Sequence, residues 1–286
     1  MTPHARRDRS LAQTLLMPLV TYGFLTVGAI VMLLPFVWMI LASFMTSAEV
    51  IARPLTWFPS ALRLDAYEKL ADAIPLARNY LNSAIVTSLT TAGILLTSSL
   101  AGYGFAKFRF RGRDLIFLLV LATMMIPFFV VLIPVFYIIS KLDWVNSFQG
   151  LIVPNIVTGF GIFLMRQYML SLPDEVLDAA RIDGASEFQI YWRMVIPMST
   201  PVVGSLGILA IVYQWNSFLW PLVVARSSDM WTVPVGLRSL QVYATGADVI
   251  NMQMAGAALA VVSIIIVFLL LQRYFVQGIA LTGMKG

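Results

Sequence analysis

The chain has 286 residues, of which 59% are hydrophobic and only 12% carry a charged side chain. Soluble domains are about half apolar and about one quarter charged, so this composition indicates a protein that crosses a membrane several times. There is no cysteine, and the one histidine is His4, which excludes disulfides, cysteine-based metal sites and a histidine-based active site. No lysine precedes serine or threonine, which excludes a P-loop for ATP. The net charge of +5 comes from short loops between apolar segments and does not indicate nucleic acid binding.

Six apolar segments organise the chain, each near the roughly 20 residues that a bilayer requires. They cover residues 15–42, 80–106, 115–139, 149–165, 201–225 and 255–272. Pro127 and Pro134 predict a kink or break in the third segment. Pro154, Gly159 and Gly161 predict that the fourth is irregular or tightly packed. We therefore predict an all-α, polytopic membrane protein with six transmembrane helices.

The basic residues predict the orientation of these helices. With the N-terminus inside, the inner segments hold 12 lysines and arginines and the outer segments hold 7. The cluster KFRFRGR at 107–113 carries the most weight, because short loops follow the positive-inside rule. Both termini and residues 171–200 are then cytoplasmic. We expect one transmembrane domain at 15–276, with tails at 1–14 and 277–286.

Residues 171–201, SLPDEVLDAARIDGASEFQIYWRMVIPMSTP, hold five of the fourteen acidic residues. Ser171 as N-cap and Pro173 in the first turn predict the start of a helix. Gly184 suits a left-handed position that closes this helix, and Ser186 with Gln189 forms a second capping box. The segment therefore predicts two short helices, joined by a bend at Gly184, that lie on the membrane face.

The first of these helices has two different sides. Asp174, Asp178 and Arg181 recur at i, i+4 and i+7, which places them on one face. The other side holds Val176, Ala179, Ala180 and Asp183. We expect the charged face to be offered to a partner. The alternative is an interfacial helix pair without a partner.

The six apolar segments contain no Asp, Glu, Lys, Arg or His. Ion-coupled carriers usually place ionisable groups at membrane depth, so this absence favours an energy source outside the membrane. The acidic segment at 171–200 is a place where such a source can attach. A self-sufficient secondary carrier or facilitator remains the alternative. A membrane enzyme is disfavoured, because no histidine, cysteine or intramembrane carboxylate is available for chemistry.

The spacing of this acidic segment resembles the EAA loop of ABC-importer permeases. Asp178-Ala179-Ala180 is followed after three residues by Gly184 and after nine more by residues 194–197, MVIP. Asp178 stands where the family has Glu. Other stretches resemble the carbohydrate branch, in particular the smaller permease of maltose- and glycerol-phosphate-type importers: 81–89, 99–113, 124–134, 146–154, 161–173, 215–222 and the C-terminal residues. The resemblance implies a type I ABC importer permease fold of the MetI-like kind.

The resemblance also implies partners. These are a second permease in a heterodimer, two ATPase subunits that bind ATP and magnesium, and an extracytoplasmic solute-binding protein, at a bacterial or archaeal cytoplasmic membrane. This chain itself is expected to hold no cofactor. The implied substrate is a sugar or oligosaccharide, with a non-sugar solute such as glycerol phosphate as the alternative. The residues implied in ATPase coupling are Asp178, Ala179, Ala180, Arg181, Gly184 and Pro197, and those of an ATPase-contacting tail are Met284, Lys285 and Gly286.

A substrate path can also be suggested from side-chain chemistry. Trp215, Asn216 and Trp220 combine indole faces, which stack on sugar rings, with an amide that bonds to hydroxyls. The alternative is that they are interfacial anchors with an interhelical amide bond. Met124 and Met125 lie in a kinked apolar stretch that either gates the path or packs between helices. Residues 102 and 104, both glycine, predict close helix packing.

Overall fold

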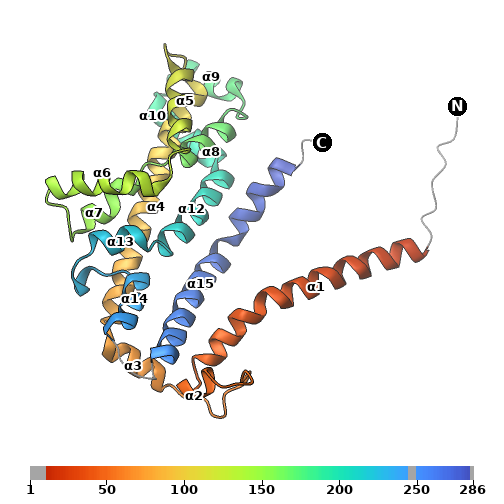
Figure 1. Cartoon of the computed structure of the whole chain (residues 1–286). Coiled ribbons are helices and arrows are strands. Elements are labelled where there is room, and N and C mark those ends of the chain that lie inside the picture. Colours follow the sequence, from red (N-terminus) through yellow and green to blue (C-terminus); the bar gives the residue numbers. More distant parts are fainter. Residues whose placement is uncertain (1–10, 244–248, 284–286) are drawn as a thin grey trace. The chain divides into compact units, whose positions relative to one another are not determined.

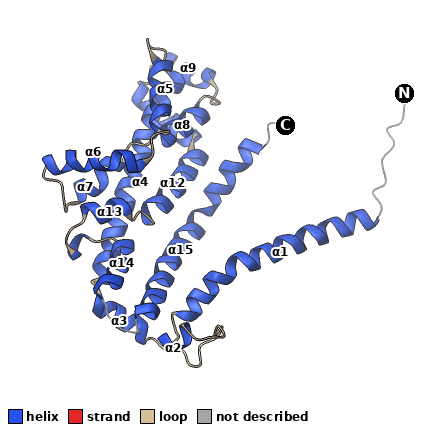
Figure 2. Cartoon of the chain, in the orientation of Figure 1, coloured by secondary structure: helices blue, strands red, loops and turns tan. Residues whose placement is uncertain are grey.

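The computed structural model describes residues 11–243 and 249–283, which form helices and loops without a strand in these ranges (Figures 1 and 2). The chain divides into two compact units, one of residues 1–70 with 245–259 and one of residues 71–244 with 260–286. We call them the N-terminal unit and the main unit. The α-helices are α1 Leu11–Ala42, α2 Ser47–Val50, α3 Asp65–Ala73, α4 Leu76–Lys107, α5 Arg113–Thr123, α6 Phe128–Lys141, α7 Phe148–Ile152, α8 Gly159–Met169, α9 Asp174–Ile182, α10 Glu187–Ile190, α11 Ile196–Met198, α12 Thr200–Trp215, α13 Leu219–Val224, α14 Val233–Tyr243 and α15 Val249–Gly283.

Three helices are long and apolar enough to cross a membrane, and the number rises to six if each bent helix pair is one span. The three long ones are Met17–Ala42 of α1, Leu76–Lys107, which is α4, and Val249–Leu270 of α15. The bent pairs join α5 to α6, α7 with Val153–Asn155 to α8, and Glu187–Met198 to α12. The described ranges therefore hold three to six spans, in an all-helical fold.

Proline breaks the third apolar segment as its sequence predicts. α5 and α6 meet at an angle of 100°, and Pro127 stands at the N-cap of α6. Pro134 lies inside α6. The fourth segment is irregular as well, because a 3₁₀ turn at Val153–Asn155 separates α7 from α8 with a bend of 43°.

The fifth apolar segment differs from its prediction. It was expected to continue to Ala225, but α12 ends at Trp215 and α13 is a separate short helix. Asn216 follows α12, and its side-chain Nδ2 donates to the carbonyl of Val212 at 2.7 Å. Short amide side chains compete with the backbone for such bonds, which favours the end of a helix at this position.

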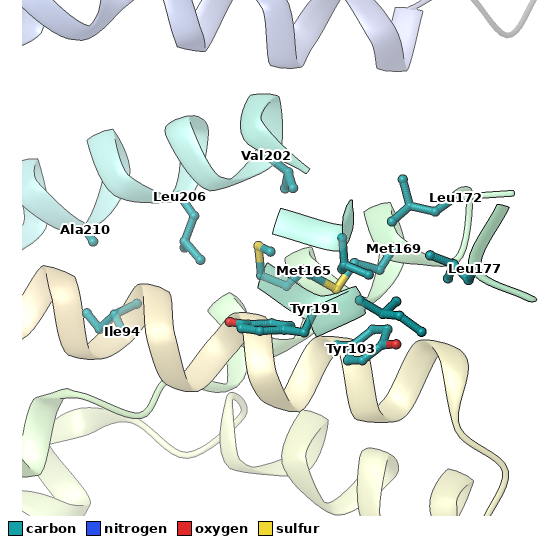
Figure 3. Close-up of a cluster of buried hydrophobic side chains, with 12 residues drawn as sticks. Ile94, Tyr103, Met165, Met169, Leu172, Leu177, Tyr191, Val202, Leu206 and Ala210 are labelled. Atoms are coloured by element: carbon teal, nitrogen blue, oxygen red, sulfur yellow. The ribbon is translucent and has the colours of Figure 1, made fainter. Parts of the chain in front are cut away.

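The core of the main unit forms where α4 packs against α8 and α12 (Figure 3). A β-carbon at Gly102 would lie 2.6 Å from that of Met165, so the α4 and α8 backbones approach too closely for a side chain. Gly104, which the sequence paired with Gly102 as a packing glycine, has no such neighbour within 4 Å. Close packing was therefore predicted correctly for Gly102 and wrongly for Gly104.

The N-terminal unit has a small core of its own. Ala42, Met45 and Val50 are buried, and Met254 packs against them. α2 begins with a capping box, in which Thr46 accepts from the backbone of Glu49 and the Glu49 carboxylate accepts from the backbone of Thr46. These contacts fix the chain directly after α1.

We predict that Gly102→Ala lowers the melting temperature of the purified protein. The added methyl must displace Met165 or the backbone, and overpacking typically costs about 1–3 kcal/mol. Gly104→Ala is the matched control, since it has open space and replaces glycine in a helix, which is worth up to about 1 kcal/mol in stability. Equal melting temperatures for the two variants would contradict the close approach of α4 to α8.

Candidate functional site

α9 and α10 form the two-helix element that the acidic segment predicts. Gly184 has φ +82°, the left-handed conformation expected at the bend. Ser186 and Gln189 form the expected capping box at the start of α10. The predicted start of α9 is two residues early, because Pro173 occupies the N-cap position. Ser171 instead donates its hydroxyl to the carbonyl of Tyr168 at 2.7 Å, at the end of α8.

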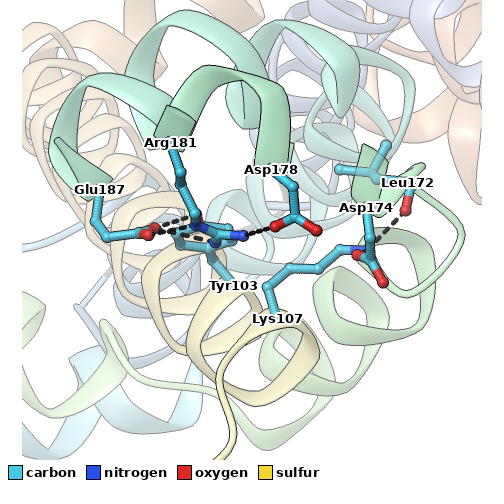
Figure 4. A network of polar contacts seen from close by, with 7 residues as sticks. All are labelled: Tyr103, Lys107, Leu172, Asp174, Asp178, Arg181 and Glu187. Atoms are coloured by element: carbon cyan, nitrogen blue, oxygen red, sulfur yellow. Dashed lines mark hydrogen bonds and ion pairs between the residues drawn. The ribbon is translucent and has the colours of Figure 1, made fainter. Parts of the chain in front are cut away.

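Arg181 ties the two helices together across the bend (Figure 4). Its Nε donates to Oε1 of Glu187 at 2.7 Å, and its Nη1 donates to Oδ1 of Asp178 at 2.6 Å. The hydroxyl of Tyr103, on α4, donates to Oε2 of Glu187 at 2.7 Å. These contacts join α9, α10 and α4, and we call them the arginine clamp.

Lys107 attaches the start of α9 to the last residue of α4. Its Nζ donates to Oδ1 of Asp174 at 2.6 Å and to the carbonyl of Leu172 at 2.7 Å. The Lys107 side chain is 5% exposed, whereas that of Asp174 is 73% exposed. An ammonium group that is withdrawn from water requires such partners. We call this second connection the lysine clamp.

The clamps favour the charged forms of Asp174 and Glu187. The hydrogen bond from Lys107 lowers the pKa of Asp174 below its usual value. The hydrogen bond from Arg181 lowers the pKa of Glu187, and Glu187 in turn raises that of Arg181. Because the pKa of each of these two acids is lower in the folded than in the unfolded protein, its ionisation stabilises the fold at pH values above the unfolded pKa. This stabilisation is lost as the pH falls through the pKa of the folded protein. The clamps are therefore complete at neutral pH.

Buried apolar side chains also hold α9 in place. Leu177 of α9 has an exposed fraction of 0%, and it belongs to the buried cluster that includes Met169, Tyr191 and Val195 (Figure 3). The hydroxyl of Tyr191 is hydrogen-bonded to Oγ of Ser99, on α4, at 2.6 Å. α9 is therefore held to the main unit by packing as well as by charge.

The face of α9 that points away from these contacts carries both apolar and acidic side chains, since exposed Glu175 lies at i−4 from Ala179 and i−7 from Ile182. Val176 and Ala179 are exposed, and Ile182 is 86% exposed. Exposed carboxylates stand beside them, at Asp178 and Asp183 among others. The sequence correctly places Asp174, Asp178 and Arg181 together, but their clamps connect them to this chain. The free surface is the side that holds Val176, Ala179 and Ile182.

Pro197 lies in α11, after a π-helical turn at Tyr191–Val195. Proline has no amide hydrogen for the carbonyl four residues earlier, so a regular α-helix is disfavoured here. The helix ends at Ser199, and the chain bends by 77° into α12. Ala180, another residue implied in coupling, packs against the buried cluster.

The residues of the suggested substrate path lie in different environments. Trp220 is 3% exposed, donates its indole N–H to the carbonyl of Gly150 at 3.0 Å and packs edge-on against Phe128. Trp215 is partly buried, with its ring 5.9 Å from that of Tyr80.

Three further path residues, Asn216, Met124 and Met125, are exposed. The path stays a prediction. The tail residues Met284, Lys285 and Gly286 lie outside the described residues. Among the residues that are described, no group of three or more His, Cys, Asp or Glu side chains could hold a metal ion.

The sequence-based prediction assigns no role in the site to four of its members. Lys107 was counted only as part of the basic cluster, and Tyr103 and Glu187 were given no role. Leu177, the apolar residue that seats α9, was also missed, although it lies one position before Asp178 in the EAA-like motif. The only signal for Lys107 and Tyr103 was their spacing of four residues on one helix face.

Comparison of the sequence and the fold with known proteins defines the class of this protein. Residues 93–281 match the family model of the binding-protein-dependent transport system inner membrane component. The chain belongs to this family of ABC transport permeases. An arabinooligosaccharides transport system permease protein of Halalkalibacterium halodurans is 39% identical, over 94% of this chain and 96% of the relative.

Two further relatives are each 32% identical over 91% of this chain and 94% of their own length. One is a lactose transport system permease protein of Rhizobium radiobacter, and the other is an sn-glycerol-3-phosphate transport system permease protein of Pectobacterium atrosepticum. The fold is similar to that of a chain in the crystal structure of a bacterial ABC transporter involved in alginate import. The TM-score is 0.80 at 23% identity, covering 96% of this chain and 100% of the other.

We predict that the arginine clamp persists at neutral pH and weakens only below about pH 4.5, the unperturbed pKa of glutamate, because the pKa of Glu187 is lower in the folded protein. Since the chain has no cysteine, a spin label on Asp183→Cys is unique, and its mobility reports the bend. Arg181→Gln should make the label mobile already at pH 7.

Arg193→Gln removes an exposed arginine outside the clamp and is the control, which should leave the label unchanged. If the Arg181→Gln and wild-type spectra coincide at pH 7, the clamp does not hold the bend.

Proposed function

We propose that this chain is one of two permease subunits of an ATP-driven, binding-protein-dependent importer of sugars or oligosaccharides. It forms half of the translocation pathway, and α9 with α10 couples it to an ATPase. The proposed partners are a second, different permease, two ATPase subunits and an extracytoplasmic solute-binding protein. The names of the relatives, which refer to arabinooligosaccharides and lactose, support the substrate class.

The observation that carries the coupling role is that α9 is fixed on one side and free on the other. Two clamps and Leu177 attach it to α4 and to the core. A displacement of α9 would therefore be transmitted to α4, which is long enough to span the membrane. Its free face combines exposed apolar side chains with carboxylates, as suits a partly desolvated protein interface. A helix that lay at the membrane surface without a coupling role would not need these attachments.

Asp178 can serve both the clamp and a partner. One carboxylate oxygen accepts from Arg181, while the side chain as a whole is 62% exposed. The other oxygen is therefore available to an arginine of the ATPase. The tail residues Met284, Lys285 and Gly286 are proposed to reach the same partner, which rests on the family resemblance alone.

The chain is proposed to have no enzymatic activity and no cofactor of its own, with ATP and magnesium bound by the ATPase subunits. The alternative is a self-sufficient carrier or facilitator. Transport by the purified chain alone in liposomes would favour that alternative. A glycerol phosphate permease is the second alternative, which the relative with that name supports. Trp215 and Asn216 remain the candidates for sugar contact.

We propose that the chain lies in a bacterial or archaeal cytoplasmic membrane with both termini inside, as one transmembrane domain at 15–276 with tails at 1–14 and 277–286. Cysteines at Ser10, Arg111 and Ser186 should then resist an impermeant thiol reagent in intact cells, whereas one at Leu64 should react. Permeabilised cells provide the control, since Arg111, Ser186 and Leu64 are exposed in the structure. Labelling in the opposite pattern would refute this orientation.

We predict that Asp178→Ala and Gly184→Val reduce sugar import more than they reduce the amount of chain in the membrane. Asp178→Ala removes one of the two carboxylates that Arg181 binds and the acid that is proposed to meet the ATPase, and a branched residue is strained at the positive φ of Gly184. Import, membrane abundance and ATPase co-purification are measured for both variants.

Asp72→Ala is the control, because it removes an exposed acid on α3, outside both clamps and outside the free face of α9. Near-normal import by both Asp178→Ala and Gly184→Val would exclude the coupling role.

A further inference from the structure

The loop between α4 and α5 contains a hollow that neither the topology nor the coupling site explains. It has a volume of about 520 Å³ and is lined by residues 109, 110 and 112–115. The lining includes the guanidinium groups of Arg109 and Arg113 and one carboxylate, Asp114. We propose that this hollow binds the headgroup of an anionic phospholipid.

The hollow is preformed by contacts within the chain. Gly112 has φ +83°, which lets the loop turn back into α5. Arg113 donates to Oδ1 of Asp114 at 2.9 Å and to the carbonyl of Phe108 at 3.5 Å. The ring of Phe108 packs edge-on against Tyr103, which is buried on α4. The loop is therefore held in shape without a ligand.

Arg109 is the cation that is available to a ligand. It is exposed and, among the residues that the structure describes, its recorded interaction is an electrostatic one with Asp174, without a hydrogen bond. Arg113 has a carboxylate partner, and Lys107 is committed to the lysine clamp. A guanidinium with free donors suits a phosphate, because its fork can bind two phosphate oxygens at once.

The surface beside the hollow suits the acyl chains of a lipid. Leu115 lines the hollow and is 62% exposed, and Leu118 and Leu119 are exposed at i+3 and i+4, so the three form one row along α5. The opposite side of α5 is fixed through Phe117, which is buried and has the guanidinium of Arg166 4.0 Å from its ring. A phosphate site continuous with an apolar row fits an amphiphile better than a free phosphate or a nucleotide.

The position of the loop agrees with a lipid. The hollow directly follows α4, which is long enough to span the membrane, and directly precedes the bent span of α5 and α6. It is therefore expected at the level of the headgroups. Clusters of basic residues next to a transmembrane helix attract anionic lipid, at roughly fivefold in affinity for each cation.

The test measures lipid binding to the full-length chain in its purified complex by native mass spectrometry. Phosphatidylglycerol is titrated against phosphatidylcholine with the same acyl chains. We expect preferential binding of phosphatidylglycerol and a roughly fivefold loss of its affinity in Arg109→Gln. Arg193→Gln removes another exposed arginine as the matched control and should retain the wild-type affinity. Asp114→Asn, which removes the negative charge of the hollow, should bind more tightly.

Several outcomes would overturn the proposal. One is equal binding of the two lipids, and another is equal loss in Arg109→Gln and Arg193→Gln, which would indicate general charge attraction. Displacement of phosphatidylglycerol by millimolar inorganic phosphate would assign the hollow to free phosphate. Loss of the ATPase subunits from the purified Arg109→Gln complex would assign it to a protein contact.

Discussion

Arg181 is the residue on which the shape of the α9–α10 element depends. Gly184 permits the bend by adopting a positive φ, but glycine is flexible and does not by itself fix the angle between the two helices. The guanidinium, which reaches Asp178 on one side and Glu187 on the other, selects one bend angle. Isolated surface ion pairs contribute little to stability. This one gains from its forked geometry and from Tyr103, which fixes the carboxylate that Arg181 binds.

The two clamps meet α4 at residues that lie one helical turn apart. Tyr103 and Lys107 are at i and i+4, so they share a face at the end of this helix. One binds α10 through Glu187 and the other binds the start of α9 through Asp174. Leu177 belongs to the same buried cluster as Tyr103, so packing as well as both clamps attaches the element to the last turn of α4. A displacement of α9 must then move α4, because no flexible linker separates them.

The sequence predicts the features of this site that depend on neighbours in the chain. The bend at Gly184, the capping box of Ser186 and the break at Pro127 each follow from one residue type in one local pattern. The partners of Asp174 and Glu187 on α4 are 67 and 84 residues away, and no local pattern specifies them. The contacts that Arg181 makes with Glu187, and Asp174 with Lys107, are likewise not specified by the spacing within α9. Periodicity assigns residues to a common face, but only packing decides which face is buried.

The residues of the basic cluster at 107–113 have two different roles, which sequence alone does not distinguish. Lys107, Arg109 and Arg113 lie within seven residues, and by composition they are equivalent signals for topology. Lys107 is the last residue of α4 and turns into the protein, where it is bonded to Leu172 and Asp174. Arg109 follows the end of that helix, where the extended backbone at Phe108 redirects the chain, and its side chain remains in solvent.

The helix end thus separates a buried cation, which positions α9, from an exposed cation, which we propose binds lipid. If a lipid phosphate binds Arg109, it holds the loop only two residues from the lysine clamp. The negative charge of the membrane then acts next to the lysine clamp, which holds the α9–α10 element that the ATPase is proposed to displace. Coupling through α9 should therefore depend on the lipid as well as on the protein partner, because both forces meet at the end of α4.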